Sequence, residues 1–244
     1  MRKKTKIGLW SAGAVVVIVG GAALAFGPSV YADYANGVAD AAPTLAPASP
    51  APTGTADAST APASTVPAVN PAELSGSWSV GEDSFAGYRV NEVLRNQDIT
   101  VTGRTEDVTG ELTVEGLSLT AATITVDVAG IATDEGARDA YFRGTAMQAD
   151  KFPTATFRLT EPVLIEAPLA GVAQTVSAAG ELTLHGVTRP VTVDLQAALT
   201  DTGGQVVGSI PITFSDYGVE APDLGFVSVE DAGAVEFSLT LAQT

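Results

Sequence analysis

Cysteine is absent from this chain of 244 residues, and histidine occurs only once. Without cysteine the chain can form neither disulfides, nor a cysteine-ligated zinc site, nor a thiol nucleophile, nor an acylated lipobox cysteine. Charged residues make up only 16% of the sequence, and 28 acidic residues outnumber 12 basic ones. Alanine, valine and threonine dominate instead, which favours a β-rich protein over a charged helical bundle.

The charge is unevenly distributed along the chain. Residues 1–72 carry four basic and three acidic side chains, which leaves eight basic and 25 acidic side chains for residues 73–244. A domain that acidic repels phosphate backbones, so no nucleic-acid partner is expected.

The only cluster of basic residues lies at the N-terminus, in residues 1–6, and twenty uncharged residues from Ile7 to Phe26 follow it. As a helix this stretch would span about 30 Å, enough to cross a bilayer. Positive flanks stay in the cytoplasm, so the sequence predicts a cytoplasmic tip over 1–6 and a single-pass transmembrane signal anchor over 7–26 in the cell membrane. In the alternative interpretation the stretch is a signal peptide, and the chain is secreted after cleavage near Ala32. Both interpretations place the rest of the chain outside the cytoplasm.

Residues 27–72 are predicted to form an extracytoplasmic linker rich in Ala, Pro, Ser and Thr. Seven prolines fall within residues 40–72. Such a segment buries too little apolar surface to offset its ordering entropy, so we expect it to be disordered and to act as a stalk.

The remaining domain, residues 73–244, shows short runs in which apolar and polar residues alternate. In 123–128, 191–196 and 235–241 the apolar residues share one face, as in half-buried antiparallel strands. One helix is expected from Asp134, as its N-cap, to about Gly144. Eight or more strands imply a sandwich or a closed barrel. Further strands are expected at 77–90, 98–104, 108–120, 154–166, 174–185 and 205–215.

A search for catalytic patterns finds none. The sequence has no G-x-S-x-G elbow, no G-x-G-x-x-G loop and no phosphate-binding loop. His185 lies where one strand turns into the next, and we interpret its ring as a hydrogen-bonded brace of that hairpin. No metal, no cofactor and no enzymatic activity are therefore predicted.

Three ordered motifs lie within about 55 residues: RDAYFR at 138–143, KFPTATF at 151–157 and GELTLHGVTRPVTV at 180–193. Together with SDYGV at 215–219 they resemble the motifs of the YceI-like family. The resemblance covers nearly all of the exported domain. It implies an all-β fold, an extended antiparallel lipocalin-like β-barrel with a short inserted helix, whose apolar lumen holds a polyisoprenoid or related lipid. The sequence departs from the family pattern at Tyr141, Phe214 and 130–133.

The resemblance and the predicted strands together define candidate site residues. Arg138 and Asp139 can form a polar rim near a lipid head group, or a structural pair that locks the helix to a loop. Lys151 can be a rim cation or a solvated lysine, and Arg189 can contact the ligand or fix the turn. The predicted function is that of a membrane-tethered lipid-binding protein, and the alternative is a surface-displayed structural or adhesion sandwich without a ligand. Whether the domain forms a homodimer stays open. The ligand-lining candidates are Phe85, Tyr88, Tyr141, Phe142, Phe152, Phe157, Phe214 and Tyr217, and the polar or family-motif candidates are Arg138, Asp139, Lys151, His185 and Arg189.

Overall fold

The structure is a computed structural model that describes residues 28–45, 70–94, 96–165, 171–200, 203–223 and 227–244. The predicted transmembrane stretch lies outside these residues. Within them, no helix is both long and apolar enough to cross a bilayer. The strands are β1 Gly76–Val80, β2 Phe85–Leu94, β3 Gln97–Thr105, β4 Val108–Glu115, β5 Ser118–Asp127, β6 Thr154–Leu159, β7 Val163–Leu164, β8 Gln174–Leu184, β9 Val187–Thr200, β10 Gly203–Thr213 and β11 Val227–Gln243. The helices are α2 Pro28–Val38, α3 Pro71–Leu74, α4 Gly136–Tyr141, η1 Phe142–Ala146 and η2 Phe214–Tyr217.

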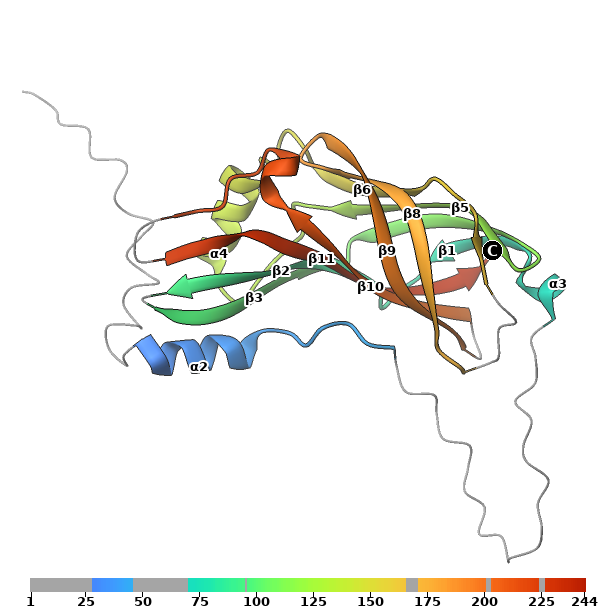
Figure 1. The fold of residues 1–244 in the computed structure, drawn as a ribbon, viewed down its shortest axis with the longest axis horizontal. Coiled ribbons are helices and arrows are strands. Elements are labelled where there is room, and N and C mark those ends of the chain that lie inside the picture. The colour runs from blue at the N-terminus through green and yellow to red at the C-terminus, as the bar shows by residue number, and fades with distance from the viewer. Residues whose placement is uncertain (1–27, 46–69, 95, 166–170, 201–202, 224–226) are drawn as a thin grey trace, which may run out of the picture.

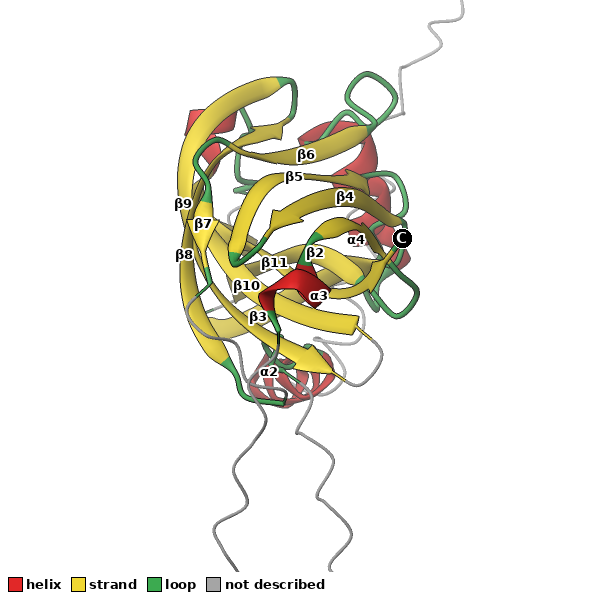
Figure 2. Cartoon of the chain, turned by 90° about the vertical axis from the view of Figure 1, so that its right-hand side faces the viewer, coloured by secondary structure: helices red, strands yellow, loops and turns green. Residues whose placement is uncertain are grey.

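Antiparallel strands close into a barrel in the order β1-β4-β5-β6-β8-β9-β10-β11. The ring closes because β1 also pairs with β11, for example Val80 with Leu241. Figure 1 shows the barrel from the side, and Figure 2 shows it from the end that carries α3. The prediction of an all-β antiparallel barrel with a short helix is confirmed, and closure of the ring excludes the sandwich.

Strands β2 and β3 extend the barrel wall at the end opposite α3. Strand β2 pairs with the N-terminal part of β11. Among the described strands β3 pairs only with β2, and along its other, free edge Arg104 forms an isolated bridge with Ala132. The strands predicted at 77–90 and 108–120 are each interrupted. Residues 81–84 separate β1 from β2, and Gly116 turns β4 into β5 with a φ of 63°, which a glycine adopts without strain. We call the end with β2, β3 and α4 the helix end of the barrel.

The inserted helix begins one residue later than expected. Glu135, not Asp134, is the N-cap of α4, because the Glu135 side chain accepts from the backbone N of Ala137. The carboxylate of Asp134 pairs with Arg138 instead, at 2.9 Å. The helix continues as one π-helical turn, η1, so the predicted end near Gly144 agrees with the structure to within two residues.

Helix α2 lies within the range predicted as linker. It packs against β3, where Ala32 and Ala35 are buried. The chain then runs along the barrel wall to residue 45 (Figure 1). We call residues 28–45 the strap. Ala32 and Ala35 are three residues apart, so they lie on the same face of the helix, and this face packs against β3.

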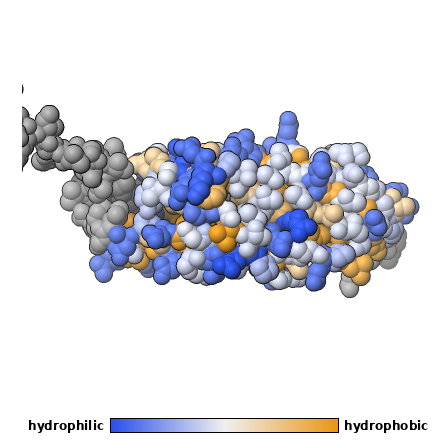
Figure 3. Space-filling model, turned by 90° about the horizontal axis from the view of Figure 1, so that it is seen from above, coloured by the Kyte–Doolittle hydropathy of each residue, from blue (hydrophilic) through white to orange (hydrophobic). Residues whose placement is uncertain are grey.

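Two groups of buried apolar residues lie in opposite halves of the barrel. One includes Trp78, Leu112 and Leu239 near α3, and the other includes Val128, Met147 and Tyr217 near the helix end. The face of the molecule in Figure 3 shows mainly hydrophilic and intermediate residues, with scattered apolar ones. The apolar faces of the strands therefore point inward.

Candidate functional site

A cavity of about 210 Å³ occupies the half of the barrel nearer α3. We call it the first cavity. Its walls come from the apolar faces of the alternating strands, and none of the described residues that line it is charged. Its aliphatic lining includes Ile124, Val126, Val193, Leu195, Val235, Leu239 and Leu241, on the faces that the alternation predicts.

A second cavity of about 150 Å³ lies toward the helix end. The two cavities adjoin, because the same five residues line both of them. The two cavities thus lie one after the other along the barrel, and we call them together the lumen. The shared residues are Ala86, Val126, Ala155, Leu182 and Val235.

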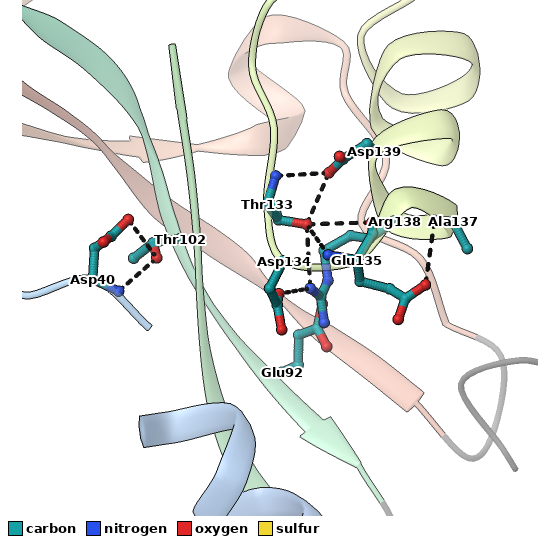
Figure 4. Close-up of polar contacts among 9 residues, drawn as sticks. All are labelled: Asp40, Glu92, Thr102, Thr133, Asp134, Glu135, Ala137, Arg138 and Asp139. Atoms are coloured by element: carbon teal, nitrogen blue, oxygen red, sulfur yellow. Dashed lines mark hydrogen bonds and ion pairs between the residues drawn. The ribbon is translucent and has the colours of Figure 1, made fainter. Parts of the chain in front are cut away.

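Charged groups meet the lumen at the helix end. Arg138 and Glu92 both line the second cavity, and the Nε of Arg138 lies 3.7 Å from the Oε1 of Glu92. The Nη1 of Arg138 donates to Asp134 Oδ1 at 2.9 Å (Figure 4). Burial raises the pKa of Glu92, while Arg138 opposes this shift and Asp134 adds to it. Arg138 is thus already shared between two carboxylates.

Tyr88 brings an aromatic face and a hydroxyl to the same end of the lumen. Its ring stacks on Phe142 with centroids 4.8 Å apart and an interplanar angle of 24°. Burial raises the pKa of the Tyr88 hydroxyl. The positive charge of Arg138 opposes this shift, and the neighbouring carboxylates add to it. The hydroxyl is neutral at physiological pH, so it can donate or accept a hydrogen bond with a polar ligand group.

Asp139 holds the loop before α4 in place. Its Oδ1 accepts from the backbone N of Thr133 at 2.9 Å and from the Thr133 hydroxyl at 2.8 Å, and the residue is buried. Arg138 also contacts the Thr133 hydroxyl, at 3.4 Å. Asp139 therefore faces the loop, while its neighbour Arg138 faces the lumen.

The predicted aromatic residues divide between the lumen and other positions. Phe85 carries the guanidinium of Arg104 over its ring at 4.3 Å, and Phe152 packs edge-on against His185 with centroids 4.6 Å apart. Among the described residues, neither Phe85 nor Phe152 lines the first or the second cavity. Phe157 lines the first cavity, and Tyr88, Tyr141, Phe142, Phe214 and Tyr217 line the second.

The other polar candidates lie around η2 and the turn between β8 and β9. The Nδ1 of His185 lies 3.1 Å from the carbonyl oxygen of Tyr217, and the Nε of Arg189 donates to the carbonyl oxygen of Asp216 at 2.9 Å. The Nζ of Lys151 lies 4.7 Å from the ring centre of Phe152. Lys151 and His185 thus share a contact with Phe152, and His185 and Arg189 both contact η2.

Sequence reasoning on aromatic residues missed the aliphatic lining and two acidic residues of the second cavity, Glu92 and Glu220. Aliphatic side chains supply most of the lining, and their signal was the alternation in the strands. Glu92 was missed as well, because nothing near it in the sequence marks it as buried. Its position becomes clear only when β2 lies beside Arg138.

A closed antiparallel barrel around an elongated apolar lumen is the architecture of a lipocalin-like binding protein. The sequence pattern of the YceI-like domain matches residues 79–241, about two thirds of the chain. The chain therefore belongs to the YceI-like family.

Relatives and solved structures of this kind resemble the chain at low identity. A UPF0312 protein of Pseudomonas aeruginosa is 28% identical over 161 residues, which cover 62% of this chain and 78% of the relative. A polyisoprenoid binding domain from Saccharophagus degradans superposes with a TM-score of 0.55 at 18% identity, covering 68% of this chain and 98% of that domain. Burkholderia cenocepacia BcnA superposes with a TM-score of 0.50 at 22% identity, covering 64% and 96%. These two structures support the fold.

The buried carboxyl of Glu92 makes a testable contribution to stability. Because its pKa is raised in the folded state, the folded protein keeps this proton to higher pH than the unfolded chain. Its stabilising contribution is fully present below the unfolded value of about 4.5 and is lost as the pH rises through the folded pKa.

Glu92→Gln should therefore gain stability relative to the unmodified protein as the pH rises from 4.5 toward neutrality, measured by urea denaturation. Glu115→Gln, on the exposed end of β4, is the control for net charge. A stability difference between Glu92→Gln and the unmodified protein that does not change with pH would contradict the assignment.

Proposed function

We propose that this protein binds one elongated lipid, of the polyisoprenoid type, in its barrel lumen and carries or sequesters it without catalysis. The membrane stretch Ile7–Phe26 tethers it to the extracytoplasmic face of the cell membrane. The observation that carries the proposal is the lumen itself, two adjoining apolar cavities with charged groups at one end. The Saccharophagus degradans domain of the same fold is described as polyisoprenoid binding, which gives further support.

The energetics favour a chain-like ligand. Each methylene removed from water contributes about 0.8 kcal/mol, so a lipid tail binds tightly in an apolar lumen without polar contacts. The polar end of the ligand then belongs at the helix end, beside Tyr88, Glu92 and Arg138. Because Arg138 already pairs with two carboxylates, a head group there gains most from hydrogen bonds with Tyr88 and least from negative charge.

The alternative of a ligand-free adhesion domain calls for an interior filled by side chains. Two adjoining cavities with almost wholly apolar walls count against that alternative, because a closed barrel of this size can fill its interior.

Native mass spectrometry of the purified full-length chain tests the proposal. We expect a mass increment of one amphiphile per chain, which extraction with organic solvent removes and identifies. Incubating the extracted protein with vesicles that contain a polyisoprenoid alcohol should restore the increment. A protein that is folded, empty on purification and still empty after this incubation would refute lipid binding.

A further inference from the structure

The strap meets β3 along the edge where β3 has no neighbouring strand. Asn36 spans two backbone groups of this edge. Its Nδ2 donates to the carbonyl oxygen of Asp98 at 3.1 Å, and its Oδ1 accepts from the backbone N of Thr100 at 2.8 Å. The edge therefore has polar partners in the strap. The apolar part of the contact consists of Ala32, Ala35, Leu94, Ile99 and Val101.

Beyond α2, charged groups of the barrel hold the strap. The backbone N of Asp40 donates to the Thr102 hydroxyl at 2.9 Å, as Figure 4 shows. Arg89 donates to the carbonyl oxygen of Asp40 at 2.7 Å, and Arg104 donates to the carbonyl oxygen of Ala41 at 2.6 Å. Residues 32–41 are thus fixed to the barrel at several points, and the strap is part of the folded domain.

The contacts also set the direction of the strap. Asn36 lies at 98–100, Asp40 at Thr102 and Ala41 at Arg104, so strap and β3 run parallel. At about 1.5 Å per helical residue, Pro28 lies roughly 12 Å before Asn36. The strap therefore begins at the helix end of the barrel, where Figure 1 also shows α4.

In the sequence, Gly27 alone separates the strap from Phe26, the last residue of the uncharged stretch. The proline-rich residues 46–69 come later in the chain. They connect the strap, which Arg104 still holds at Ala41, with α3, whose Leu74 is buried in the barrel. The proline-rich segment therefore adds no reach between the uncharged stretch and the barrel.

We propose that the strap fixes the helix end of the barrel against the lipid bilayer, so that the second cavity opens toward the membrane. This inference rests on the membrane tether of the proposed function, and it replaces the stalk with a short, docked connection. Tyr141, Ala221 and Pro222 line the second cavity at this end and are half-buried. A lipid can then pass between bilayer and lumen without crossing water.

Charge makes a fixed connection necessary. Residues 73–244 carry 25 acidic and eight basic side chains, so an anionic membrane surface repels the barrel. On a long free linker the barrel would stay at a distance from the membrane surface and would sample all orientations. The strap holds it close in one orientation.

Two single-cysteine variants of the full chain test this orientation. Thr145→Cys places the label on η1 at the helix end, and Thr175→Cys places it on β8 near the opposite end. Both threonines are exposed, and the natural sequence contains no cysteine. Each variant is labelled with bimane and reconstituted into phosphatidylcholine–phosphatidylglycerol vesicles containing a lipid spin-labelled at its head group. We expect strong quenching at position 145 and little at position 175.

Two insertions then separate a docked connection from a stalk. A Gly/Ser insert of about 20 residues has a root-mean-square reach of roughly 25 Å. Between Gly27 and Pro28 it should abolish most of the quenching at position 145, whereas between Thr60 and Ala61 it should leave the quenching unchanged. Equal quenching at 145 and 175, or equal losses from the two inserts, would overturn the inference.

Flotation of the chain with the vesicles distinguishes a failed membrane tether from a wrong orientation of the barrel. A chain that does not float with the vesicles overturns both the tether and the docked orientation. A chain that floats and carries its lipid, but quenches equally at both positions, overturns the orientation alone.

Discussion

Replacing Ala122 by phenylalanine should weaken lipid binding in the lumen roughly tenfold. Ala122 lies on β5, is buried and lines the first cavity. The larger ring takes up space that a ligand tail would occupy. Displacing two methylenes at ~0.8 kcal/mol each is enough for roughly tenfold weaker binding. Native mass spectrometry should show the lipid-bound fraction falling accordingly.

The neighbouring residue supplies a matched control. Ala121 is exposed on the opposite face of the same strand, so Ala121→Phe adds the same ring outside the barrel and should leave lipid binding unchanged. Thermal unfolding of both variants shows whether lipid binding is lost because the ring fills the cavity or because the fold is damaged. If Ala122→Phe is as stable as the unmodified protein and retains all its lipid, the first cavity is not the binding site.

Replacing Arg89 by methionine should cause the largest loss of stability. Glu236 is 5% exposed, and the Nε of Arg89 donates to its Oε1 at 2.6 Å. Removing the cation leaves a buried carboxylate unpaired, which costs about 3–5 kcal/mol of unfolding free energy. The strap loses the donor to the carbonyl oxygen of Asp40 at the same time. Chemical denaturation measures the loss.

Two further variants identify the cause of that loss. Arg89→Met combined with Glu236→Leu removes both charges and should recover most of the stability, because a buried ion pair replaced by apolar groups is close to neutral. Arg158→Met breaks an exposed pair with Glu181, whose side chains are 63% and 41% exposed, and should cost less than about 1 kcal/mol. A double variant no more stable than Arg89→Met would show that packing, rather than the unpaired charge, causes the loss.

The strand pattern of the sequence carried most of the information about the lumen. The alternating faces of 123–128 and 235–241 predicted which side chains point inward, and these residues line the cavities. Periodicity alone left sandwich and barrel open, because closure depends on the pairing of β1 with β11, which are far apart in sequence. The motifs of the YceI-like family resolved that choice.

Other features had no local signal. Residues 27–72 are predicted as one linker because of the composition of 40–72, and no local pattern marks Ala32 and Ala35 as contact residues. Their burial depends on the free edge of β3, which only the tertiary structure creates. Likewise, Asp134 is a better N-cap than Glu135 by residue type, but its carboxylate pairs with Arg138, and Glu135 caps the helix instead.

The free edge of β3 also bears on how copies of this protein avoid one another. An exposed strand edge is a template for pairing with the same strand of another molecule and is a common origin of aggregation. Asn36 occupies the carbonyl of Asp98 and the amide of Thr100, and Ala132 pairs with the backbone of Arg104 further along. Two molecules could join their β3 strands only by first displacing the strap. The segment that precedes the barrel thus keeps neighbouring molecules from joining into a continuous sheet through β3.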